Sequence, residues 1–172
     1  MAEKREMTPA VREALKGLTP FSRDKSSDFT PDFFKTETER KGEKGKTIKE
    51  PIIPVEFHPV FKIRPFTKDE LKAAREILSK VYQNIKAKAE GNSEKYSSEH
   101  FSEVDSMARK VCIGWDNYYN SGTEKLMEWE KEEDGGCREM VFELVPSKIT
   151  TAIFLHSARI SGILDLERLG LE

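Results

Sequence analysis

Apolar and polar residues follow clear periods from residue 51 onward, and these periods predict the elements of the fold. Residues 57–64 alternate between the two classes, with Phe61 and Ile63 in the apolar set, which is typical of a half-buried strand. Pro59 and Pro65 cannot donate a ladder hydrogen bond, so this strand is expected at the edge of its sheet.

A long amphipathic helix is predicted to follow this strand. Thr67 and Glu70 have the spacing of a capping box, in which each side chain accepts from the other residue's backbone amide. Apolar residues then recur at helical spacing from Leu71 to Ile85, and polar residues occupy the other face. Gly91 is the expected stop.

A second helix is predicted over residues 98–113, with Gly114 ending it and an aromatic loop following over 115–122. Trp115 is interpreted as a core residue, because large aromatic side chains dominate small cores. Tyr118 and Tyr119 are expected to be more exposed and to be candidates for partner contact.

Residues 139–145 alternate like a strand, which allows but does not require a hairpin with the 57–64 strand. Pro146 then opens a third helix that is apolar as far as Leu164. Phe154 and Leu155 widen the apolar face of this helix beyond a simple stripe. Such a helix is either central to a core or half of an interface.

The first fifty residues differ from the rest because they contain little apolar clustering. A short amphipathic helix is possible over 8–18, and the remainder reads as linker or extended arm. The sequence therefore predicts a disordered or extended arm over 1–50 and a single small helical domain over 51–172. The expected fold is mainly α with a small β element (α+β): a compact three-helix core with one or two short strands.

No constellation of residues predicts an enzyme, a cofactor or a metal site. His58, His156 and Cys137 share no metal-ligand spacing with the other histidines or cysteine. His156 is interpreted as a buried, hydrogen-bonded residue. Cys112 and His100 are twelve residues apart on one predicted helix, about 18 Å by the helical rise, so they cannot form a nucleophile pair.

Composition removes several classes of function. The net charge is −2 with both signs mixed along the chain, which disfavours nucleic-acid binding. No apolar run reaches the length of a membrane span, and the N-terminus lacks the apolar core of a secretory signal. The two cysteines are expected to be free thiols in a reducing compartment, so we expect a cytoplasmic protein.

The order of elements resembles that of small tail-assembly chaperones of long-tailed bacteriophages. The similar segments are Phe57–Leu71, with its Ile-Arg-Pro-Phe-Thr step, and Val111–Asn117, with its Gly-Trp step. An Asp-Gly loop at 134–135 and the Pro-led helix from Val145 complete the resemblance, which covers residues 51–164.

The resemblance implies a non-enzymatic protein that binds the tape-measure protein, keeps it soluble in the host cytoplasm and recruits tail-tube subunits. We expect the last helix to make the contact, with Phe154, Leu155 and Ile160 outermost. Self-association is also possible. The alternative is a structural component of the virion, such as a head or tail completion protein, that contacts neighbouring subunits through the N-terminal arm.

Overall fold

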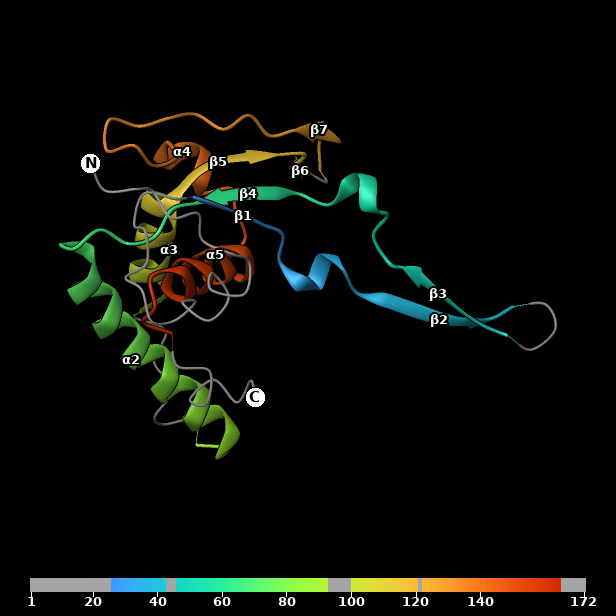
Figure 1. Ribbon diagram of the computed structural model, residues 1–172, viewed down its shortest axis with the longest axis horizontal. Coiled ribbons are helices and arrows are strands. Elements are labelled where there is room, and N and C mark those ends of the chain that lie inside the picture. The colour runs from blue at the N-terminus through green and yellow to red at the C-terminus, as the bar shows by residue number, and fades with distance from the viewer. Residues whose placement is uncertain (1–25, 43–45, 93–99, 121, 165–172) are drawn as a thin grey trace, which may run out of the picture.

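The computed structural model describes residues 26–42, 46–92, 100–120 and 122–164. Within these ranges the chain forms four α-helices, two 3-10 helices and seven strands in three small antiparallel sheets (Figure 1). The helix expected over 8–18 lies outside the described residues. The strands are β1 (Ser27–Phe29), β2 (Glu37–Lys41), β3 (Thr47–Pro51), β4 (Val60–Ile63), β5 (Cys112–Asp116), β6 (Tyr119–Asn120) and β7 (Lys125–Leu126). The helices are η1 (Asp32–Phe34), η3 (Val55–Phe57), α2 (Glu70–Ala89), α3 (His100–Val111), α4 (Glu139–Phe142) and α5 (Ser147–Ile160).

The main sheet has the order β1-β4-β5, so the strand predicted over 57–64 exists but is central. The expectation that it would be an edge strand is wrong. Pro59 and Pro65 flank the four paired residues instead of lying among them, so they remove no ladder hydrogen bond. The alternation is as predicted, because Phe61 and Ile63 are fully buried and Lys62 is exposed.

Helix α2 begins at the predicted capping box. The Glu70 amide donates to Thr67 Oγ1 at 3.3 Å, and the Thr67 amide donates to Glu70 Oε2 at 2.8 Å. The same carboxylate accepts two hydrogen bonds from the Arg64 guanidinium, at 2.8 and 2.9 Å, which join the end of β4 to the helix. Gly91 follows the helix with a φ of +67°, which glycine adopts without a steric cost.

The free energy of unfolding is expected to fall on acidification because of Glu70. Burial alone would raise the pKa of Glu70, but hydrogen bonds from Arg64 and Thr67 outweigh it and hold the pKa below its ordinary value of 4.5. A carboxylate with a lowered pKa in the folded state stabilises the fold at neutral pH. That contribution is lost as the pH falls through the folded-state pKa. Urea titrations at neutral pH and near pH 3 should show that acidification lowers the free energy of unfolding less for Glu70→Gln than for the wild type. Equal losses would contradict the assignment.

The second predicted helix is present as α3, but it passes directly into a strand. Cys112–Asp116 forms β5, which pairs with β4 and places Trp115 opposite Phe61. Trp115 is 7% exposed and its ring nitrogen donates to the Met127 carbonyl at 2.7 Å, so its interpretation as a core residue is confirmed. The loop predicted over 115–122 is wrong at residues 115–116 and 119–120, which belong to the strands β5 and β6.

The strand predicted over 139–145 is wrong, and so is its hairpin with the 57–64 strand. The segment begins as the one-turn helix α4, in which the Phe142 amide donates to the Arg138 carbonyl at 3.0 Å. Both edges of β4 are already taken by β1 and β5, which leaves no position for a further partner. Phe142 and Val145 are buried while Met140 and Leu144 are exposed, so the alternation does not mark one buried face.

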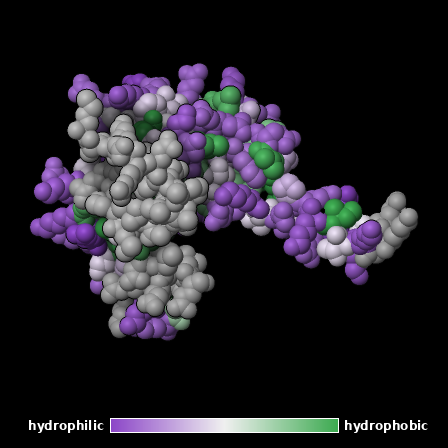
Figure 2. All heavy atoms as spheres, viewed as in Figure 1, coloured by the Kyte–Doolittle hydropathy of each residue, from purple (hydrophilic) through white to green (hydrophobic). Residues whose placement is uncertain are grey.

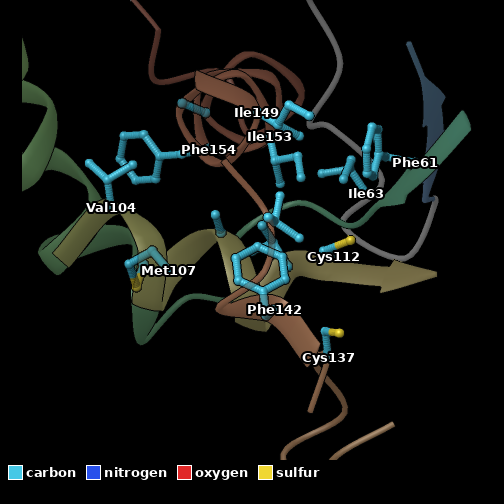
Figure 3. Close-up of a cluster of buried hydrophobic side chains, with 14 of the residues drawn as sticks. Phe61, Ile63, Val104, Met107, Cys112, Cys137, Phe142, Ile149, Ile153 and Phe154 are labelled. Atoms are coloured by element: carbon cyan, nitrogen blue, oxygen red, sulfur yellow. The ribbon is translucent and has the colours of Figure 1, made fainter. Parts of the chain in front are cut away.

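Helix α5 begins at Ser147, directly after Pro146 as predicted, and it is the central helix of the fold. It packs chiefly against α3 and also contacts β1 and β4. In the core, Phe154 points from α5 toward Val104 of α3, and Ile149 and Ile153 lie above the sheet residues (Figure 3).

The predicted three-helix core is therefore wrong. The described chain is an α+β mixture in which a three-stranded sheet shares the core with α2, α3 and α5. Part of the difference between the predicted and the observed fold comes from residues 26–50, which the sequence places in a disordered or extended arm. They supply β1, an edge strand of the main sheet, and a separate β2–β3 ribbon that projects from the core (Figure 1).

Candidate functional site

A groove of about 220 Å³ opens where α2, α3 and α5 come together, and most of its walls are apolar. Val81 and Val104 are buried at its base, while Ile85 is 36% exposed. Leu155 lines the groove from α5 and is only partly buried. The apolar wall consists of Val81, Ile85, Phe101, Val104 and Leu155, with the methyl-bearing Thr151 beside them.

One part of the groove lining is polar. Asn84 Nδ2 lies 3.1 Å from His100 Nδ1, and both side chains are buried. Lys88 also lines the groove and its side chain is exposed. The described lining therefore offers an apolar surface with the cation of Lys88 beside it, which suits an apolar helix face carrying a nearby carboxylate.

The structure separates the predicted contact residues of the last helix. Leu155 lies in the groove, whereas Ile160 is at the C-terminal end of α5 and is partly buried. Phe154 is fully buried, so its predicted outermost position is wrong. The centroid of its ring lies 5.5 Å from that of Phe66, and α5 packs against α3 and against the strands β1 and β4.

The two tyrosines are also separated. Tyr118 is 6% exposed and its ring makes edge contacts with Phe61 and Trp115, so its predicted exposure is wrong. Burial raises the pKa of its hydroxyl to about 12. Tyr119, the first residue of β6, is 38% exposed, as predicted.

Tyr119 belongs to a second apolar surface, here called the base patch, that the sequence did not indicate. Its ring meets that of Phe57 edge-on at 5.6 Å, and Leu126 lies opposite it across the β6–β7 pair. Val55, which lies in η3 with Phe57, is 68% exposed. Figure 2 shows apolar atoms over η3 and the β6–β7 hairpin, at the base of the ribbon.

A second pocket formed by the described residues, about 410 Å³ in volume, is mostly polar and lies between α3, α4 and the start of α5. Thr150 donates a hydrogen bond to Asp105 within it, and Arg109 binds Asp134 with a shortest distance of 2.6 Å. That hydrogen bond from Arg109, together with its charge, lowers the pKa of Asp134. The lining holds neither histidine nor cysteine, and its contacts hold α3, α5 and the 131–137 loop together.

The candidate metal and nucleophile residues are placed apart or used structurally. Within the described residues, no three His, Cys, Asp or Glu side chains gather into a group that could hold a metal ion. His156 is partly buried, and its ring stacks on that of Phe29 with the centroids 4.2 Å apart. Its Nε2 lies 3.2 Å from Ser27 Oγ, so both contacts connect α5 with β1. Burial, with the charge of Arg159, lowers its pKa.

Cys112 and Cys137 are both free and both buried (Figure 3). Burial raises the pKa of Cys112 to about 12 and that of Cys137 to about 11. Because the thiolate is the reactive form of cysteine, both side chains act as apolar packing groups at neutral pH.

The groove wall contributed by Ile85 and Phe101 was not predicted. Each belongs to the apolar set of its own predicted helix, and only the packing of α2 against α3 makes them line one groove. No helix in the described part of the chain is both long and apolar enough to cross a membrane. Comparison with family models, curated proteins and solved structures finds no significant match in any of the three.

Proposed function

We propose that this chain is a non-enzymatic assembly chaperone of a long-tailed bacteriophage, and that it shields an apolar helix of the tape-measure protein in the host cytoplasm. The observation that carries the proposal is the apolar groove between α2, α3 and α5. An apolar groove of this kind, formed by the described residues of three helices, is suited to helix-in-groove recognition. The tape-measure protein is proposed as the partner on the basis of the sequence resemblance. The same resemblance implies that the chain also recruits tail-tube subunits.

The chemistry of the groove specifies the segment that it would accept. Val81, Phe101 and Leu155 require an apolar stripe with residues at helical spacing. Lys88 favours a carboxylate beside that stripe, and such a pair at the rim contributes more to orientation than to affinity. A tape-measure segment of this kind would aggregate when exposed, which is the property that a chaperone suppresses.

Leu155→Asp is expected to abolish solubilisation of the co-expressed tape-measure protein, because a carboxylate in the groove opposes burial of an apolar helix. Leu155 is partly exposed, so the variant should remain folded. The readouts are the soluble fraction of the partner and its co-purification, with circular dichroism of the variant as the folding control. Leu144→Asp is the matched control, since Leu144 is 62% exposed outside the groove. Equal co-purification by wild type and Leu155→Asp would contradict the proposal.

A second candidate function is a structural component of the virion, and the projecting β2–β3 ribbon favours it. An extended ribbon can reach a neighbouring subunit that a compact core cannot. The two candidates differ in one simple observation. A chaperone is absent from purified particles, whereas a head or tail completion protein is present in them at a fixed copy number.

A further inference from the structure

The β2–β3 ribbon leaves both of its edges unpaired among the described strands. β2 and β3 pair only with each other, and nine of their ten residues are exposed. The ribbon projects from the core (Figure 1). An isolated two-stranded ribbon is marginally stable in water, and its free edges can template the addition of another strand. The ribbon is therefore a candidate for strand addition.

The register of the ribbon shows which backbone groups face outward. The Gly42 amide donates to the Lys46 carbonyl, and the Ile52 amide donates to the Thr36 carbonyl, both at 2.9 Å. These bonds flank the five ladder pairs, and hydrogen-bonded pairs alternate with non-hydrogen-bonded ones in an antiparallel ladder. The odd-numbered residues consequently direct their backbone groups away from the ribbon. They are Glu37, Glu39 and Lys41 on the β2 edge, and Thr47, Lys49 and Pro51 on the β3 edge.

We propose that two copies of this chain pair antiparallel through their β3 edges, about a twofold axis at Ile48. This register places Thr47 of each copy opposite Lys49 of the other, so the outward amides and carbonyls of both residues are satisfied. Ile48 then faces its own counterpart at a non-hydrogen-bonded position, where side chains are closest. Lys46 of each copy faces Glu50 of the other, which makes two charge pairs related by symmetry.

Two competing twofold registers, centred on Lys49 of β3 and on Glu39 of β2, are poorer in charge or in hydrogen bonding. Centring β3 on Lys49 sets two lysines opposite each other and gives Thr47 a proline partner, Pro51, that has no amide hydrogen. Centring the β2 edge on Glu39 sets two glutamates opposite each other at the axis. The Ile48 register avoids both faults, so the charges and backbone groups of the β3 edge are complementary to those of a second copy.

The arrangement is closed. A twofold interface uses the same edge of both copies, so pairing through β3 consumes both β3 edges and forms a four-stranded sheet. The outer edges are then the two β2 strands, whose central Glu39 opposes further self-pairing. The paired edge is short, so we expect a dimer that forms as the protein concentration rises instead of a permanent one. This inference does not rest on the proposed function.

The test is the association state of the full-length chain and of single-cysteine probes in the ribbon. Sedimentation velocity should show a monomer–dimer equilibrium that shifts with concentration. Ile48→Cys should form a disulfide-linked dimer under mild oxidation, and Thr38→Cys on the same ribbon face should not. Glu39→Cys reports pairing through the β2 edge. The native Cys112 and Cys137 are buried and do not interfere. A monomer at all concentrations, or cross-linking of Glu39→Cys without Ile48→Cys, would overturn the proposal.

Charge reversal provides an independent arm of the test. Lys46→Glu should weaken the dimer at least several-fold, because it sets two glutamates against each other at both symmetric positions. The double variant Lys46→Glu/Glu50→Lys should restore the dimer, because the pairs are re-formed with the signs exchanged. Arg40, which pairs with Glu50 at 2.7 Å, is exposed enough to turn away from the introduced lysine. Failure of the double variant to regain dimer would also count against the register.

Discussion

Replacing Phe154 by alanine is expected to lower the free energy of unfolding by about 3–5 kcal/mol, the usual cost of removing a buried phenylalanine ring. Phe154 is fully buried between α5 and α3, and its ring lies 5.5 Å from that of Phe66. The cost includes lost apolar burial and the cavity that the rigid neighbours leave open. It would be read from urea unfolding curves with unchanged slope.

The adjacent Leu155 provides the matched control for Phe154. It lines the open groove and is only partly buried, so Leu155→Ala should cost much less than Phe154→Ala. The pair therefore reports the rotation of α5 about its axis. If the two alanine variants were equally destabilised, or if Leu155→Ala were the worse, the helix would present a different face to α3.

Gly136→Ala is expected to be the second strongly destabilising change. An added Cβ at this position would lie 2.6 Å from the Arg109 carbonyl oxygen and 2.8 Å from the Lys110 Cα. Both are backbone atoms of α3, so they cannot turn away as a flexible side chain could. The loop would have to move away from the end of α3. It would then lose the hydrogen bond that the Cys137 amide donates to the Arg109 carbonyl at 3.1 Å.

The expected cost of Gly136→Ala is at the upper end of the range of about 1–3 kcal/mol for overpacking. In a chain of this size, each kcal/mol lowers Tm by about 2–4 °C, which differential scanning fluorimetry resolves. Gly114→Ala is the control, because its added Cβ would meet the flexible Lys62 side chain at 3.3 Å. A Tm for Gly136→Ala equal to that of Gly114→Ala would show that the loop does not lie against α3.

The sequence predicts elements well where local signals are strong. The capping box at Thr67 and the proline before α5 each define a helix start without reference to tertiary structure. The alternating segment 139–145 is predicted wrongly because the choice between strand and helix depends on whether a sheet edge is free. The arrangement of strands also depends on β1, whose three residues carry no periodicity of their own.

The candidate surfaces are less predictable than the elements. Helical periodicity assigns Phe154 and Leu155 to the same broad apolar face, and only packing against α3 shows that one is core and the other lines a groove. The base patch joins residues from three separate segments, so no local pattern could indicate it. Tyr118 and Tyr119 are adjacent in sequence and differ in burial, because Tyr118 packs against Phe61 and Trp115 while Tyr119 lies in the short strand β6 and is partly exposed.

Hydrogen exchange of the purified chain, measured with and without the tape-measure protein, would show whether the groove binds this partner. We expect slower amide exchange on binding in the segments that frame the groove, namely the second half of α2, the start of α3 and the middle of α5. The β2–β3 ribbon should keep the exchange rate that it has in the free protein at the same concentration. Protection confined to the ribbon and the base patch, with unchanged exchange around the groove, would contradict the account.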